Sequence, residues 1–119
     1  MNLKLSTRTV DGVAVVDCTG RIVFGEESIA LREQVKNLLA ENRKQLVINL
    51  GGVTYIDSGG LGTLVGLYTS ARSAGGSVKL ARLTHRVGEL LQVTKLLTVF
   101  EVFENEDQAI RSYRKTAVA

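Results

Sequence analysis

The first pattern along the chain is an alternation of apolar and polar positions, which is typical of β-strands. Residues 3–10 alternate in this way, and residues 13–19 are rich in β-branched side chains. The dipeptide Asp11-Gly12 stands between them and favours a tight hairpin turn. The pattern therefore predicts that the chain opens with two antiparallel strands.

Helical spacing replaces the alternation after Ser28. Apolar residues then recur every three or four positions and predict a first helix that ends near residues 41–44. These residues are Leu31, Val35, Leu38 and Leu39. The following segment, residues 45–50, is short, almost wholly apolar and free of glycine. Such a segment suits a strand that is covered on both faces, so we expect it in the middle of the sheet.

The rest of the chain alternates between helix and strand. We expect helices over residues 59–74, 86–94 and from Asn105 onward, and strands over 77–83 and 99–103. The sequence thus predicts the α/β class, with a mixed sheet of about five strands packed with about four helices. The sheet would consist of the N-terminal hairpin followed by parallel strands joined by right-handed crossovers. We expect residues 1–119 to form one domain whose tail, residues 116–119, is frayed.

Composition narrows the class of protein. Hydrophobic residues make up 45% of the 119 positions and charged residues 23%, the balance of an ordinary soluble domain. No apolar run approaches the roughly 20 residues that span a membrane, and the N-terminus does not resemble a secretion signal. We therefore expect a cytoplasmic protein that does not bind membranes.

Charge and cysteine content exclude several kinds of site. The net charge is +3, but the basic residues are scattered and the chain has no Trp to interleave with them, so we expect no direct nucleic-acid partner. Cys18 is the chain's one cysteine and lies in an apolar run, where it reads as a buried small residue. His85 is equally alone in its class, which argues against a metal site.

The segment from Gly51 to Gly62 is the most informative part of the sequence. It contains five glycines around Asp57 and Ser58 and follows the most buried-looking strand. Sites in α/β sheets form beyond the C-terminal ends of strands, and a helix start there offers unpaired amides to an anion. Either Asp57 or Ser58 can cap the helix.

Glycines at the start of a helix need an explanation because each lowers helix stability by about 1 kcal/mol relative to alanine. The three concerned are Gly59, Gly60 and Gly62. Their presence indicates that another backbone comes close or that Ser58 must be reachable.

Known catalytic motifs do not match this segment. The phosphate-binding loop needs a Gly-Lys-Ser/Thr ending, and no Lys lies between Lys44 and Lys79. The nucleophile elbow needs a glycine two places before the serine, where this chain has Ile56. A hydrolase or transferase that uses Ser58 as nucleophile would lack a motif-supported base, and we interpret His85 as structural. We therefore expect no enzyme activity and no cofactor.

Residues 55–62, Tyr-Ile-Asp-Ser-Gly-Gly-Leu-Gly, resemble the signature of the STAS domain, in particular of bacterial anti-sigma factor antagonists. The likeness extends over nearly the whole chain, through residues 13–20, 46–50, 75–76 and 97–103. It implies that the unmodified protein binds an anti-sigma factor that is also a serine kinase, and so releases a sigma factor to regulate transcription. Phosphorylation of Ser58 would reverse this binding, with a PP2C-type phosphatase as a further partner.

The resemblance also indicates a partner-binding surface. Loops at one end of a sheet come together, so the loop from Arg21 to Glu27 should join the helix start. The expected contacts are Asp57, Ser58, Gly59, Gly60, Gly62, Arg21, Ile22, Phe24 and Glu26. Core packing of Ile22 or Phe24 is the alternative at those two positions.

This chain differs from many relatives at two positions of that surface. Gly59 stands where many have Ser, Thr or Ala, and Arg21 where an acidic residue is frequent. Charge at the rim of an interface selects partners, so these departures bear on which partner binds. The glycine-rich junction and the net positive charge also leave a second interpretation open. In that interpretation the domain binds a small anion, a nucleotide or a lipid at the helix start after Ser58.

Overall fold

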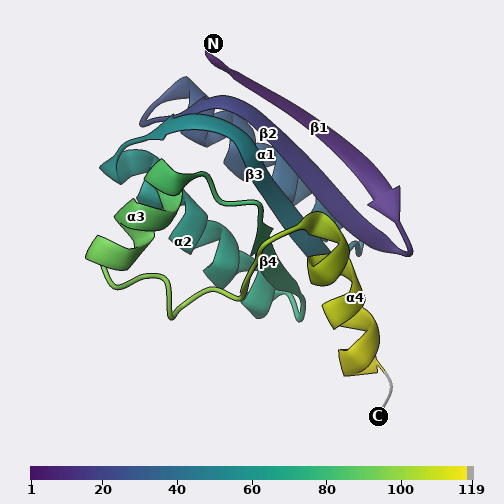
Figure 1. Ribbon diagram of the computed structural model, residues 1–119. Coiled ribbons are helices and arrows are strands. Elements are labelled where there is room, and N and C mark those ends of the chain that lie inside the picture. The colour runs from purple at the N-terminus through teal and green to yellow at the C-terminus, as the bar shows by residue number, and fades with distance from the viewer. Residues whose placement is uncertain (118–119) are drawn as a thin grey trace.

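The computed structural model describes residues 1–117 (Figure 1). Within this part of the chain, four helices and a five-stranded sheet follow one another in nearly the order that the sequence predicts. The strands are β1 (Leu3–Val10), β2 (Val13–Ile22), β3 (Gln45–Ile56), β4 (Ser77–Ala81) and β5 (Val102–Phe103). The helices are α1 (Glu26–Ala40), α2 (Ser58–Ser73), α3 (His85–Val93) and α4 (Glu106–Ala117).

The sheet has the order β1-β2-β3-β4-β5, so β3 is its middle strand as predicted. β1 and β2 form the expected antiparallel hairpin, and the pairs β2–β3, β3–β4 and β4–β5 are parallel. Parallel neighbours end at the same edge of a sheet. The C-terminal ends of β2 and β3 therefore lie together, and the loops that follow them are neighbours.

Each face of the sheet carries its own apolar core, because successive side chains of a strand point to opposite faces. In β2, Ala14 and Val16 belong to the larger core, which also contains Leu31 of α1, Leu64 of α2 and Leu91 of α3. Residues of the same strand at the alternate positions, with α4, form the smaller core. Its buried members are Val13, Val15, Val47, Ala81, Ala109, Ile110 and Tyr113. Helices α1, α2 and α3 thus share one face of the sheet, and α4 covers the other.

The strands β2 and β3 are longer than the sequence predicts. β2 continues to Ile22 instead of ending at Thr19, and β3 continues to Ile56 instead of ending at Leu50. Glycine favours turns, which is why Gly51 and Gly52 suggested that β3 ends before them. The added length of each strand depends on the other strand, because Ile22 of β2 pairs with Ile56 of β3 at the C-terminal end of the ladder.

The last strand is shorter than predicted, with two residues instead of five. Phe100 is the cause, since its side chain is buried in the larger core and meets the ring of Tyr68 edge-on at 5.6 Å between centroids. The segment before it turns back on itself, with the Val99 amide donating to the Leu96 carbonyl at 3.0 Å.

The C-terminal tail is partly helical. α4 runs through Ala117, and residues 118 and 119 lie outside the described part of the chain, so the fraying expected for residues 116–119 stays a prediction. None of the helices formed by residues 1–117 has the length and apolar character needed to cross a membrane.

Candidate functional site

The junction between β3 and α2 is built on Asp57. Its extended backbone leaves the strand, and its Oδ1 accepts a hydrogen bond of 2.7 Å from the Gly60 amide in the first turn of α2. This is the geometry of an N-cap, which satisfies an amide that the helix itself cannot pair. Asp57 is therefore the cap, and the sequence alternative, Ser58, is not.

Asp57 also ties this junction to the loop after β2. Both of its carboxylate oxygens lie 3.1 Å from the amide nitrogen of Phe24, and its own amide donates to the Ile22 carbonyl at 3.3 Å. The amides of Gly60 and then Phe24 hold the pKa of the Asp57 carboxyl below its usual value. Hydrogen bonds to the charged form cause this, so the carboxylate stays ionised at neutral pH.

Ser58 is exposed on the first turn of α2, and its hydroxyl makes no hydrogen bond to any residue that the structure describes. Capping by the neighbouring Asp57 leaves this hydroxyl free. A serine side chain in this setting can be approached by a second protein without breaking any contact of the fold.

The glycines after Ser58 let α2 approach the end of β2 closely. A Cβ on Gly60 would lie 2.0 Å from the Ile22 carbonyl oxygen, and one on Gly59 would lie 2.6 Å from the Phe24 Cβ. Atoms that close would overlap, so a side chain at Gly60 requires the backbone to move. The expected close approach is thus found at these two positions, whereas a Cβ on Gly62 has no atom of the described residues within 4 Å apart from its own stretch of helix.

The predicted contact residues around Ser58 divide into exposed and buried ones. Arg21, Glu26 and Gly62 are exposed, and Phe24 is 82% exposed. Ile22 is fully buried in the larger core, which is the alternative stated for that position. The reason is its place on β2, where pairing with Ile56 turns its side chain into the core. Gly60 is also buried, so it contributes to the site by allowing α2 to approach the end of β2.

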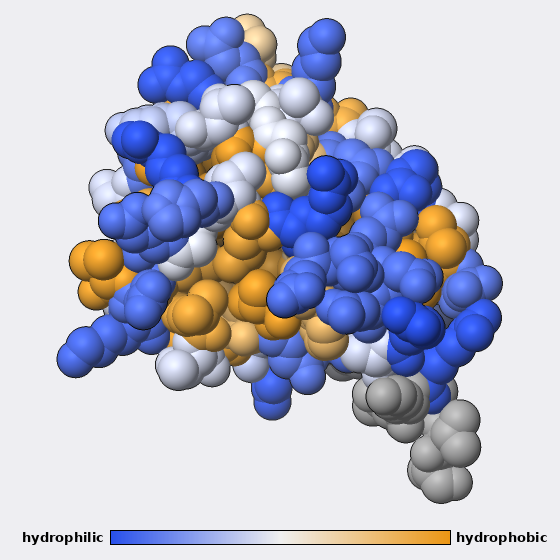
Figure 2. All heavy atoms as spheres, viewed as in Figure 1, coloured by the Kyte–Doolittle hydropathy of each residue, from blue (hydrophilic) through white to orange (hydrophobic). Residues whose placement is uncertain are grey.

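A groove of about 640 Å³ runs from Ser58 to helix α3. It is lined by Tyr55, Ile56, Asp57, Ser58, Leu61, Arg86, Glu89, Leu90, Val93 and Thr94. Apolar atoms gather on this side of the molecule, over α2, α3 and the loop after α3 (Figure 2). Val93 is 73% exposed, and Leu97 and Val99 in that loop are also exposed.

Sequence reasoning did not include α3 in the site. Its apolar spacing indicated only a core-facing helix, and Val87 and Leu91 do occupy the core. The sequence did contain one indication of this role, because Val93 is a further apolar residue of the helix besides the core pair Val87 and Leu91. Leu61 is buried and also forms part of the groove.

Two arginines lie against one aromatic ring at the end of β3. The guanidinium carbon of Arg21 is 5.0 Å from the centroid of the Tyr55 ring, and that of Arg86 is 4.7 Å from it. Distances of this size allow cation–π attraction. The ring thus holds one arginine from β2 and one from α3 beside the groove.

The remaining chemistry-bearing residues lie apart from this groove. Cys18 is buried, and its burial raises the pKa of the thiol to about 12. The His85 side chain is 97% exposed and faces Glu89 at 3.5 Å. Within the described part of the chain, no group of three or more His, Cys, Asp or Glu is arranged to hold a metal ion.

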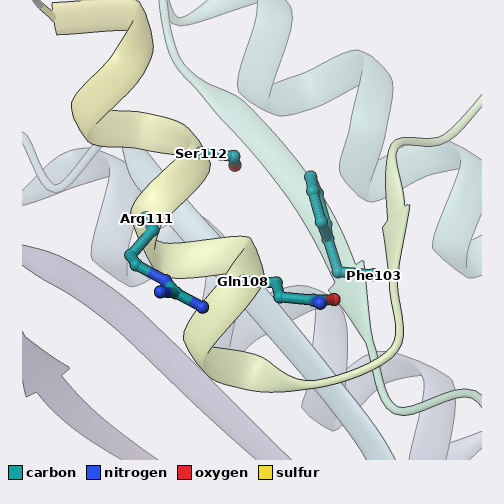
Figure 3. Close-up of a pocket in the computed structure, with 4 residues that line it drawn as sticks. All are labelled: Phe103, Gln108, Arg111 and Ser112. Atoms are coloured by element: carbon teal, nitrogen blue, oxygen red, sulfur yellow. The ribbon is translucent and has the colours of Figure 1, made fainter.

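A second hollow, of about 430 Å³, lies between β5 and α4 on the other face of the sheet. Phe103 lines it from β5, and Gln108, Arg111 and Ser112 line it from α4 (Figure 3). Its described lining contains no carboxylate, histidine or cysteine. It therefore offers no acid–base pair, and we regard the Ser58 groove as the candidate site.

Comparison with known proteins relates this site to a family. The STAS domain family profile matches residues 4–109. An anti-sigma-B factor antagonist of Bacillus subtilis is 30% identical over 93% of this chain and 100% of its own length. The crystal structure of an anti-sigma factor antagonist from Mycobacterium paratuberculosis gives a TM-score of 0.81 at 24% identity, over 94% of either chain.

The anti-sigma factor antagonist SpoIIAA of Bacillus shares the fold at lower identity. Its unphosphorylated form gives a TM-score of 0.69 over 94% of this chain and 97% of SpoIIAA, at 15% identity. Its phosphorylated form gives 0.70 over 93% and 98%, at the same identity. The profile match and the Bacillus subtilis relative together establish that the chain belongs to the STAS domain family, which includes bacterial anti-sigma factor antagonists.

Proposed function

We propose that this chain is a cytoplasmic anti-sigma factor antagonist that acts by binding a partner and catalyses no reaction. The observation that carries the proposal is the exposed Ser58, whose hydroxyl is free because Asp57 caps the helix. Family membership and the names of the relatives supply the class of partner.

In the proposed mechanism, unmodified Ser58 lies within the surface that binds an anti-sigma serine kinase. The kinase then transfers a phosphoryl group to the Ser58 hydroxyl, which adds about −1.5 to −2 charge and three acceptor oxygens. Asp57 beside it has the same sign, and a charge buried without a partner costs several kcal/mol. The modified protein therefore dissociates, and a PP2C-type phosphatase restores the binding form.

The surroundings of Ser58 favour the role of substrate over that of nucleophile. A serine nucleophile needs a base within hydrogen-bond reach. His85, the chain's one histidine, does not line the Ser58 groove and faces Glu89. Asp57 is engaged by two backbone amides. The kinase would supply the base, the nucleotide and the metal ion.

Phosphorylation by a partner kinase tests the proposal directly. The kinase is chosen from the neighbourhood of the gene, as a histidine-kinase-like ATPase encoded beside it. With ATP it should add one phosphoryl group per chain, which tandem mass spectrometry should locate on Ser58. The Ser58→Ala variant should still bind the kinase and stay unmodified, whereas Ser58→Asp should bind more weakly.

Ser73→Ala is the matched control, because Ser73 is exposed at the other end of the same helix. It should be phosphorylated and bound like the wild type. An unmodified Ser58 in the presence of a kinase that binds the chain would contradict the proposal.

A second candidate function is the binding of a small anion, a nucleotide or a lipid headgroup beside Ser58. The groove of about 640 Å³ with Arg86 in its wall favours it. Titration with inorganic phosphate, with nucleotides and with anionic vesicles, followed through the amide signals of residues 59–62, separates the two functions. If none of these probes moves the signals, this candidate is eliminated.

A further inference from the structure

The groove that Ser58 lines also contains an arginine. Ser58 lines it from α2 and Arg86 from α3. We propose that Arg86 binds the phosphoryl group once Ser58 is phosphorylated, and so acts as a positioning residue for the modified state. This inference rests on the proposed function and adds to it the group that receives the new charge.

The charges within the groove single out Arg86. Two of the described lining residues are acidic, Asp57 and Glu89, and Arg86 is the one cation among them. Asp57 is engaged by the amides of Gly60 and Phe24, and Glu89 faces His85. A phosphoryl group on Ser58 would make the groove strongly negative, and Arg86 is the counter-charge that its walls provide.

Arg86 has its charge available for such a contact. No carboxylate oxygen of the described residues lies within 4.0 Å of its guanidinium nitrogens. The guanidinium carbon lies over the Tyr55 ring at 4.7 Å from its centroid, and the N–H groups donate no hydrogen bond to any described residue. Arginine commonly pairs with phosphate through two parallel hydrogen bonds from such N–H groups.

Arg21 strengthens the preference for an anion at this point. Both guanidiniums lie within 5.0 Å of the centroid of one ring, so two like charges are held near each other. A phosphoryl group beside them would reduce that repulsion. The phosphoryl group would also occupy part of the groove that the unmodified protein offers to a partner.

The experiment uses the full chain with phosphoserine installed at position 58 during translation, so no kinase is needed. The second pKa of the phosphate, about 6 for a free phosphoserine, is followed by ³¹P NMR. Contact with Arg86 stabilises the dianion, so this pKa should fall by about half a pH unit or more in the wild type. Arg86→Gln should reverse the fall, and Arg86→Lys should restore part of it.

Arg111→Gln is the control, since Arg111 is exposed on α4 on the other face of the sheet. It should leave the phosphate pKa as in the wild type. The inference is overturned if Arg86→Gln and the wild type give the same phosphate pKa, or if Arg111→Gln shifts it equally. Failure of a kinase to modify Ser58 would count against the proposed function and would leave this titration unaffected.

Discussion

Asp57 combines two tasks at the level of a single residue. Its carboxylate caps α2 through the Gly60 amide and holds the loop after β2 through the Phe24 amide. Both bonds favour the ionised form, which is why the pKa lies below its usual value in the folded protein. Protonation should therefore weaken the fold at this point.

We predict a pH-dependent stability difference between the wild type and Asp57→Asn, a variant that keeps an acceptor but cannot ionise. Because the folded-state pKa is lowered, the wild-type advantage is complete above the unfolded-state value of about 3.9. This stability advantage should then shrink as the pH falls through the folded-state pKa of Asp57. Urea unfolding of both proteins at a series of pH values measures this, and a difference that grows toward acid pH would contradict it.

Replacing glycine by alanine should have opposite effects on stability at Gly60 and at Gly62 of α2. Gly60→Ala should destabilise the protein by about 1–3 kcal/mol, because its Cβ would overlap the Ile22 carbonyl oxygen. Gly62→Ala meets no atom of the described residues within 4 Å apart from its own stretch of helix and should stabilise by about 1 kcal/mol, the usual gain of alanine over glycine in a helix. The midpoints of urea unfolding compare the two variants, and equal losses would refute the close approach.

At the level of elements, one hydroxyl of α4 bonds to the backbone of the sheet at two strands. The Tyr113 Oη lies 2.7 Å from the Leu46 carbonyl oxygen and 2.8 Å from that of Ser77, and it accepts from the Leu46 amide at 3.2 Å. Burial raises the pKa of this phenol to about 12. The hydroxyl thus bridges β3 and the start of β4 from the helix.

We predict that Tyr113→Phe lowers the free energy of unfolding by about 1–2 kcal/mol, because buried backbone groups lose their partner. Amide exchange in α4 should accelerate more than in α1. Tyr68→Phe is the matched control, since its hydroxyl accepts only an exposed bond from Arg72. A loss for Tyr68→Phe as large as that for Tyr113→Phe would show that the effect is not specific to the Tyr113 hydroxyl.

The helices and strands were predictable where they follow from the pattern of neighbouring residues. Their ends were less predictable where these depend on pairing between strands. Alternation and helical spacing are properties of neighbouring residues, so the hairpin, the central strand and the four helices could be predicted. The last residues of β2 and β3 depend on each other, because Ile22 pairs with Ile56 from a different segment of the chain. For the same reason Ile22 and Phe24 looked alike in the sequence, although one is in the core and the other is 82% exposed.

The residues of the candidate site were likewise predictable only in part. Ser58 and its glycines could be found because they are contiguous in the sequence. Arg86 could not, because the rest of α2 and all of β4 separate it from Ser58 in the sequence, and it reaches the groove only through the packing of α3.

At the level of the whole molecule, Ser58, the proposed site of modification, lies outside both apolar cores. Its hydroxyl bonds to no described residue. We predict that Ser58→Asp keeps the fold, with a Tm within about 4 °C of the wild type. Circular dichroism and amide spectra check this, and shift changes should be confined to the groove. Loss of the spread of amide signals would contradict the prediction.

The burial of Cys18 predicts that the protein reacts little with thiol reagents, because a buried thiol with a pKa of about 12 carries almost no thiolate at neutral pH. Ser58→Cys would therefore introduce one accessible thiol into a chain whose native one reacts little. A fluorophore attached there would report the arrival and departure of a partner in real time, with little background to subtract.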